Sequence, residues 1–160
     1  MEGWKDTLLA FEKNLAPLTG FPVRKERESA NADLHISVVF TSVASTLAAL
    51  RRAGTMAENL SARITLLVPQ VVPFPLPLQS PPVLLDWNER RFRVIANETP
   101  VVTTVQIYLC RDRVEALRTV LRPHSIVVVG GRRRWWPTAE SRLARYLRQQ
   151  GHEVIFSATE

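Results

Sequence analysis

Short apolar runs alternate with amphipathic segments along most of this chain, and this alternation constrains its fold more than any other sequence feature. The clearest run is Ser125–Val129, which is nearly all apolar and is followed at once by Gly130-Gly131. Such a run is typical of a central strand in a parallel sheet, buried on both faces. Strands that alternate with helices predict a parallel sheet covered by helices on both faces.

The pattern predicts five strands and four helices. The expected strands are Leu34–Phe40, Ala62–Val68, Val101–Leu109, Ser125–Val129 and Val154–Phe156. The expected helices are Thr46–Leu60, Val83–Ala96, Asp112–Leu121 and Thr138–Gln150. Prolines interrupt residues 69–82, so that stretch is expected to be irregular. The fold class is thus α/β, a three-layer α/β/α sandwich with a five-stranded parallel sheet.

The first 33 residues follow a different pattern. Trp4, Leu8, Phe11 and Leu15 recur at helical spacing, which predicts an amphipathic helix over residues 1–15. Residues 23–33 are polar and charged, as in a linker. We therefore expect an N-terminal helix and linker over 1–33 and one α/β domain over 34–160. Whether the helix covers its own domain or a partner subunit is left open.

Positive charge is concentrated in the last third of the chain. Residues 111–160 hold ten arginines against five acidic residues, and the whole chain has a net charge of +6. A basic surface can attract nucleic acid, phosphate ligands or acidic partners. The scattered arginines can also be explained without a binding role, because this sequence uses Arg almost everywhere that another protein would use Lys.

The sequence also limits which cellular compartment and which metal sites can be expected. No apolar run reaches the ~18 residues of a membrane span, and acids stand where a signal peptide has bases. We therefore expect a cytoplasmic protein with no membrane contact. The single cysteine, Cys110, excludes an internal disulfide, and His35, His124 and His152 lack metal-ligand spacing. No metal site is expected.

Three parts of the sequence carry a family resemblance: Ser37–Thr41 with Leu47–Ala53, then Ala62–Pro69, then Ser125–Gly130 with Thr138–Arg145. They resemble the universal stress protein family, which binds nucleotides on an α/β fold of the adenine nucleotide alpha hydrolase type. Ala62–Pro69 is similar to the family's "ARLTLLHV", and Ser125–Gly130 to its "DLIVMG". Thr138–Arg145 is similar to "SVSERVLR", and Ser37–Thr41 followed by Leu47–Ala53 matches its first strand and helix. The resemblance covers residues 34–157 and implies a divergent stress-response regulator without catalytic activity.

The resemblance also implies a ligand site, because many members bind ATP through G-x2-G-x9-G-[S/T] after the fourth strand. Glycines there let the backbone approach phosphates, and the next helix start holds the anion. Gly130 fits the first glycine and is followed by Gly131, whereas the second and third glycine positions hold Arg133 and Pro137. Thr138 fits the final Ser/Thr. The loop is also shorter than the motif requires, so the site is degenerate.

Two further positions carry over from the family. Thr41 stands where members have an Asp that contacts the ribose side, and Val68 stands where backbone groups contact the base. Two interpretations remain open. Either the site is lost, or Arg132, Arg133 and Arg134 replace the glycine donors and grip a phosphate with guanidinium groups. The ligand in the second case is ATP, another adenine nucleotide or another anion.

Partner expectations come from the same segments. The resemblance implies a homodimer through the last strand, Val154-Ile155-Phe156. A protein–protein adaptor without a small-molecule ligand is the alternative function, acting through the Pro69–Pro82 loop, the Trp135-Trp136 pair and the N-terminal helix. Single-stranded nucleic acid fits the Arg-Trp run but is disfavoured, because the tryptophans are expected to pack over the sheet end or in a subunit interface.

No catalytic residue is expected. Paired carboxylates at a strand end, a Ser/His/Asp set and a phosphate-binding P-loop are all missing from the sequence. Cys110 lies beside Arg111 and Arg113, which could activate it, but a buried and inert thiol is the favoured interpretation. The protein is thus expected not to be an enzyme.

Overall fold

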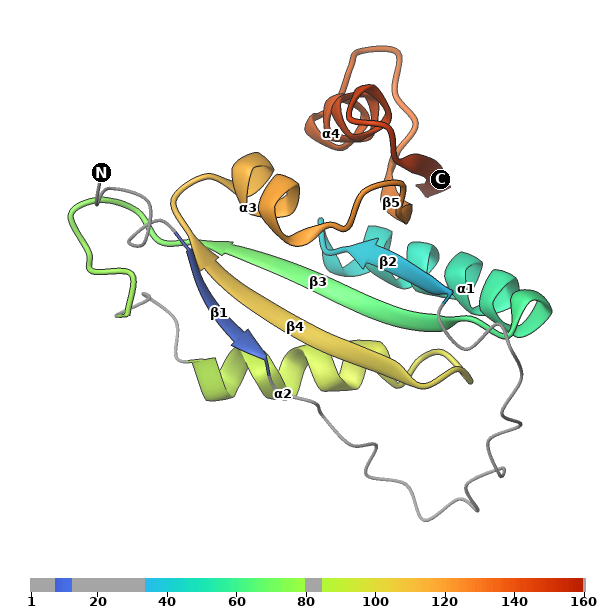
Figure 1. Ribbon diagram of the computed structural model, residues 1–160, viewed down its shortest axis with the longest axis horizontal. Coiled ribbons are helices and arrows are strands. Elements are labelled where there is room, and N and C mark those ends of the chain that lie inside the picture. Colours follow the sequence, from blue (N-terminus) through green and yellow to red (C-terminus); the bar gives the residue numbers. More distant parts are fainter. Residues whose placement is uncertain (1–7, 13–33, 80–84, 160) are drawn as a thin grey trace.

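A computed structural model describes residues 8–12, 34–79 and 85–159 of the chain (Figure 1). The described strands are β1 (Leu8–Glu12), β2 (His35–Val39), β3 (Arg63–Val71), β4 (Thr103–Cys110), β5 (Ile126–Arg132) and β6 (Glu153–Thr159). The helices are α1 (Val43–Leu60), α2 (Leu85–Ala96), α3 (Arg113–Val120) and α4 (Ala139–Gln149).

The strands form one sheet in the order β1-β4-β3-β2-β5-β6. The five strands from β4 to β6 are all parallel, as the sequence predicts. β1 is the exception, because it pairs antiparallel with β4, from Leu8 opposite Cys110 to Glu12 opposite Gln106. The described sheet is therefore six-stranded and mixed.

The helix expected over residues 1–15 is wrong where the structure describes that segment, because Leu8–Glu12 is a strand. The physical reason is that LLAF is a continuous apolar run, which fits a strand as well as a helix over so short a window. The outer edge of β4 would otherwise present unpaired N–H and C=O groups, and β1 pairs with them. The rest of the expected helix and the linker lie outside the described residues.

Helices cover both faces of the sheet, which gives the three layers (Figure 1). On one face, Val38 of β2 packs in a cluster with Leu50 of α1 and Phe92 of α2. On the other, Val39 of β2 packs with Leu117 of α3 and Leu147 of α4. Successive strand residues point to opposite faces, so the apolar run of β2 serves both clusters.

Three parallel strands, β3, β5 and β6, each run three residues past the end that the sequence predicts. β3 continues through Pro69 to Val71 and keeps pairing with β4. The carbonyl of Leu67 accepts from the Phe40 N–H at 2.9 Å, so Leu67 points toward β2, and Pro69 points the same way beyond the end of β2. The missing N–H of Pro69 therefore costs no ladder hydrogen bond.

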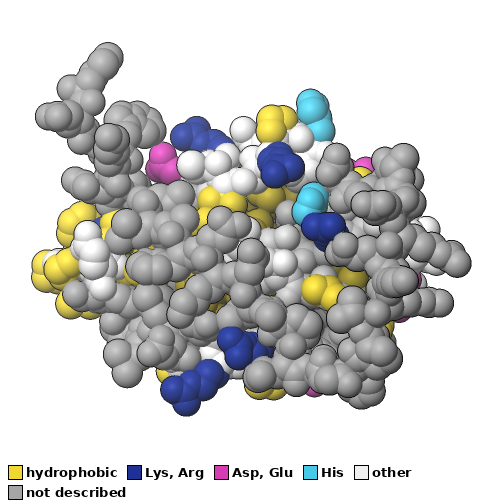
Figure 2. Space-filling view, turned by 60° about the horizontal axis from the view of Figure 1, so that its bottom comes forward, with side chains coloured by type: hydrophobic (Ala, Val, Ile, Leu, Met, Phe, Trp, Pro, Cys, Tyr) yellow, Lys and Arg dark blue, Asp and Glu magenta, His cyan; other side chains and the backbone are white. Residues whose placement is uncertain are grey.

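A proline-rich loop, residues 72–79, follows β3 and is held by Arg111. The Arg111 guanidinium donates to the carbonyls of Val72 at 2.7 Å and Leu76 at 2.8 Å, and lies 4.2 Å from the centre of the Phe74 ring. Figure 2 shows hydrophobic side chains gathered at the left edge, the end of the molecule at which Figure 1 places this loop. Phe74 is 81% exposed.

Candidate ligand-binding site

The carboxyl ends of β2 and β5 meet at the point where the chain switches sides of the sheet. β2 leads into α1 on one face, and β5 leads into α4 on the other. Ligands in doubly wound sheets bind at such a point. We call the junction of Thr41, Ser45, Gly130 and Gly131 the switch-point crevice.

Thr41 is fully engaged by its neighbours in this crevice. Its hydroxyl donates to the Gly130 carbonyl at 2.9 Å, and its N–H donates to the Thr46 hydroxyl at 3.1 Å. The structure thus brings together two residues that are far apart in the sequence and that the resemblance assigns to one site. The Thr41 hydroxyl is thus bonded to the Gly130 carbonyl, although the Thr41 side chain also borders the cavity described below.

Gly130 and Gly131 lie within β5, paired with Ser157 and Ala158 of β6, and not in the loop that the sequence predicts. A Cβ on Gly130 would stand 1.9 Å from the Ser45 carbonyl oxygen. A Cβ on Gly131 would stand 2.8 Å from Glu140 Cβ and 2.8 Å from the Phe156 ring. Backbone of α1 and side chains of α4 and β6 therefore occupy the space that a phosphate would need beside these glycines.

Val68 lies away from both glycines, in the core between the sheet and α1. Because the Leu67 backbone groups point toward β2, those of Val68 point toward β4, in register with Ile107. The N–H and the carbonyl of Val68 therefore both lie inside the hydrogen-bond ladder between β3 and β4.

Beside the crevice is a cavity of about 350 Å³ between Thr41, the start of α3 and the first turns of α4. Arg113 enters it, and its guanidinium donates to the Phe40 carbonyl. Burial lowers the pKa of the Arg113 guanidinium, and the Glu140 carboxylate opposes that shift. Among the described residues, no partner reaches its buried Nε atom. The guanidinium ties α3 to the end of β2.

The remaining predicted residues line a different feature, a groove of about 460 Å³ along α4 that we call the arginine groove. It lies between the β5–α4 loop, one side of α4 and β6. Its lining comprises Arg132, Arg133, Arg134, Trp135, Trp136, Pro137, Thr138, Ser141, Ala144, Arg145, Arg148 and Phe156. These described lining residues include five arginines and no acid, so the groove is strongly positive.

The α4 side of the groove is built by helical spacing. Thr138, Ser141, Arg145 and Arg148 recur at intervals of three, four and three, which places them on one face. The Thr138 hydroxyl caps the helix by accepting from the Ser141 N–H at 3.1 Å, and the helix start adds partial positive charge. Arg148 donates to the Val154 carbonyl at 3.0 Å, which holds its guanidinium against β6.

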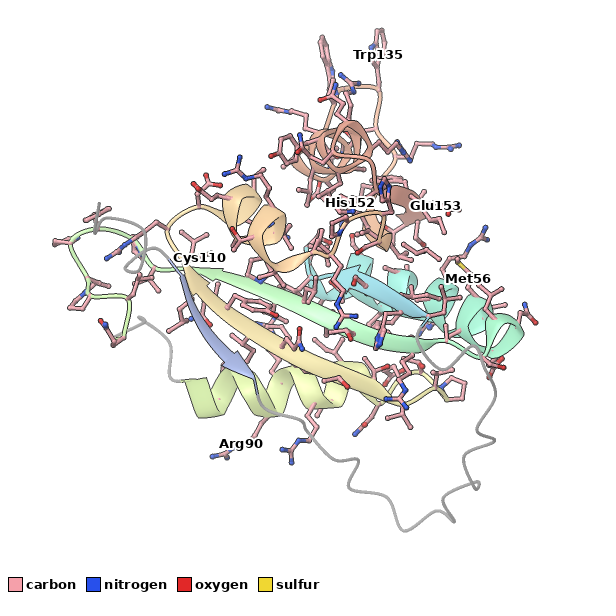
Figure 3. The ribbon with its side chains drawn as sticks, viewed as in Figure 1. Met56, Arg90, Cys110, Trp135, His152 and Glu153 are labelled. Carbon is pink, nitrogen blue, oxygen red and sulfur yellow. The ribbon has the colours of Figure 1, made fainter. Side chains whose placement is uncertain are left out.

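Trp135 and Trp136 form the rim of the groove. They are 90% and 74% exposed, and their rings stack with centroids 5.9 Å apart and planes 11° from parallel. Figure 3 shows Trp135 at the tip of the loop, pointing away from the sheet. In the described chain the tryptophans do not pack over the end of the sheet, which was one of the two expected placements. The other, packing in a subunit interface, stays a prediction.

Apart from Val68, which lies in the core, the predicted site residues fall into two groups. Thr41 and Gly130 meet in the crevice, whereas Arg132, Arg133 and Thr138 meet in the arginine groove. Sequence reasoning missed Arg145 and Arg148, although their positions seven and ten residues after Thr138 are helical spacings and were a usable signal. It also missed the placement of Arg113, for which the sequence holds no signal, because the contact depends on how α3 meets β2.

Cys110 is buried at the end of β4, as the sequence predicts. Its Sγ donates to the Gln70 carbonyl at 3.6 Å. Burial, helped by Asp112 and opposed by Arg113, raises the pKa of the thiol to about 11. A thiol with this pKa holds little thiolate near neutral pH.

The described part of the chain holds no cluster of three or more His, Cys, Asp or Glu side chains that could bind a metal ion. Within the same residues, no helix is long and apolar enough to cross a membrane.

Comparison with known proteins gives no family and no relative for this chain. No family model, no curated protein and no solved structure matches it. Function must therefore be argued from the two features above.

Proposed function

We propose that this protein is a non-catalytic regulatory or binding protein of the universal stress type, which holds a phosphate-bearing anion in the arginine groove. One observation carries the proposal: the groove gathers five arginines and no acid among its described lining. Guanidinium groups bind phosphate through paired N–H donors. The start of α4 adds to the positive potential.

The ligand is placed in the arginine groove rather than at the glycines. Ser45, Glu140 and Phe156 fill the space around Gly130 and Gly131, which supports the view that the inherited nucleotide position is degenerate. An adenine nucleotide such as ATP remains the first ligand to test, with its phosphates on Arg132 and Arg133. The family assignment and a cytoplasmic location are parts of the same proposal.

A homodimer through β6 belongs to the proposal too. β6 forms an edge of the described sheet, and a second strand can pair with the N–H and C=O groups of an edge strand. The Val154 carbonyl at this edge already accepts from Arg148, so a partner strand would have to share or displace that bond. Val154 is buried, while Ile155 and Phe156 are half-buried. Light scattering during gel filtration tests this part by giving the mass in solution.

The binding proposal is tested by thermal unfolding with ATP, ADP, AMP, cyclic nucleotides and inorganic phosphate, each with and without Mg²⁺. At a hundredfold excess over its Kd, a ligand of the folded form adds about 2.7 kcal/mol, which raises Tm by about 5–10 °C for this size. The double variant Arg132→Ala/Arg133→Ala should lose the shift. The matched control is Arg51→Ala/Arg52→Ala, an exposed pair on α1. No shift with any of these ligands would sink the proposal.

A protein–protein adaptor is the second candidate, and the loop after β3 favours it. Val71, Phe74 and Leu76 are 46%, 81% and 38% exposed, and Arg111 fixes the loop around them. A rigid exposed apolar patch is typical of a protein-binding surface. Substituting Phe74 by Ser should then abolish capture of a partner from cell extract while leaving Tm nearly unchanged.

A further inference from the structure

We propose that the arginine groove binds single-stranded nucleic acid, with arginines on the phosphates and the paired indoles stacked on bases. The inference rests on the proposed anion site and names its ligand. Its starting point is the exposed pair of Trp135 and Trp136, because phosphate binding alone gives these two side chains no role.

The indole pair is unusual because it is stacked and exposed at once. Trp135 and Trp136 present 90% and 74% of their surface to solvent. Their near-parallel planes, 11° apart, leave the outer face of the stack open to a further flat ring. Each unpaired base has such a face, and stacking on aromatic side chains is the main way proteins hold single strands without reading sequence.

The arginines extend from this stack along α4. Arg132 at the end of β5 and Arg133 and Arg134 in the loop precede the indoles. Arg145 and Arg148 continue the positive charge on the helix. From Thr138 to Arg148 the helix face is about 15 Å long. A line of cations that begins at an aromatic stack matches a chain in which phosphates repeat beside bases.

Other occupants of the groove satisfy fewer of these features. A mononucleotide such as ATP carries its phosphates in one compact chain, which can contact Arg132 and Arg133 but does not repeat along α4 to reach Arg145 and Arg148. Bases in a duplex already stack on each other, which leaves no face for the indoles. An acidic peptide would pair with the arginines but would leave the exposed indoles unexplained.

The test measures fluorescence anisotropy of labelled oligothymidylate and oligouridylate, each about 20 nucleotides long and so longer than the ~4–16 that one module covers. We expect binding that quenches tryptophan fluorescence. With five phosphate contacts, log K should fall with log [salt] at a slope of about −3.5, or about 100-fold between 50 and 200 mM. Arg132→Ala/Arg133→Ala should reduce the slope by about 1.4.

The stacking role has its own variants. Trp135→Ala/Trp136→Ala should weaken binding at least about tenfold at constant salt slope, whereas Trp135→Phe/Trp136→Phe keeps the flat rings and should retain most of the affinity. Trp87→Ala is the matched control, since Trp87 is 56% exposed on α2, in the opposite layer. Arg51→Ala/Arg52→Ala is the control for loss of charge.

Several outcomes would overturn the inference. Oligonucleotides that bind no tighter than ATP would reject it while leaving the anion proposal standing. Binding that the indole-to-alanine variant leaves unchanged would reduce the groove to a nonspecific cation patch. Tight binding of poly-glutamate with none of oligothymidylate would assign the groove to an acidic protein. If neither nucleotide nor oligonucleotide binds, both proposals fail together.

Discussion

Consecutive residues join the switch-point crevice to the arginine groove. Protein atoms pack tightly around the glycines of the crevice, whereas the groove is open to solvent. Gly130 packs against the backbone of α1, and Thr41 closes over it. Two residues further on, Arg132 is exposed and starts the groove. The difference teaches that glycines at a strand end can serve close packing instead of ligand binding, and that a candidate binding surface can lie directly beside such a closed region.

The largest expected effect on stability comes from adding a side chain at Gly130, in the switch-point crevice. Gly130→Ala would place Cβ 1.9 Å from the Ser45 carbonyl oxygen, so α1 must move away from β5. We expect a loss of about 3 kcal/mol or more in the free energy of unfolding. Denaturation by urea measures it. Gly54→Ala is the control, because its nearest atom would be at 3.5 Å, and it should be neutral or slightly stabilising. Equal effects for both variants would contradict the close packing.

The next effect concerns the Cys110 thiol at the end of β4, which β3 separates from β2 and the switch-point crevice. Since its pKa is raised from 9.0 to about 11, native Cys110 should react with a thiol reagent at pH 8 about 100-fold more slowly than the unfolded chain. The rate should rise about tenfold per pH unit up to about pH 11. The unfolded thiol ionises first, so stability should also fall as pH rises from about 9 to about 11. Rapid labelling of the folded protein at pH 8 would refute this.

A smaller effect is expected at Thr41. Thr41→Val keeps the shape but removes the hydroxyl that donates to the Gly130 carbonyl, which should cost about 1–2 kcal/mol of unfolding free energy. Thr41→Ser keeps the hydroxyl and should cost less than half as much. If the two variants were equally stable, the hydrogen bond would not be what closes the crevice.

The smallest effect on the free energy of unfolding is expected for substitutions in the arginine groove. Arg132→Ala/Arg133→Ala and Trp135→Ala/Trp136→Ala alter exposed side chains, so each should change the free energy of unfolding by less than about 0.5 kcal/mol. Urea denaturation checks this alongside the binding measurements. A large loss of stability in either variant would mean that the groove is structural, and the contrast between the two regions would disappear.

Most of the fold followed from sequence, because long apolar runs leave little choice of structure. The run before Gly130 predicted a buried parallel strand, and β5 confirms it. Failures came where local pattern was ambiguous. LLAF fits a helix or a strand, and the unpaired edge of β4 decided for the strand. Pro69 signalled a break, but its position beyond the end of β2 let β3 continue.

The candidate site was predicted only in part. Arg132 and Arg133 were identified because three arginines in a row precede a helix. Gly130 was assigned to a loop because glycine is permissive there, and the sequence could not show that α1 would press on it. Arg148 was missed because its contribution depends on contact with β6.

The sequence alone determined the alternation of strands and helices, the start of the last helix at Thr138 and the concentration of arginine after the fourth parallel strand, because these depend on local periodicity and composition. Only the tertiary structure decided that the glycines are covered and that the indoles are exposed. These two outcomes depend on which segments approach each other across the sheet. The distance from Gly130 to Ser45 is fixed by the packing of a helix on a strand many residues away, and no local pattern encodes it.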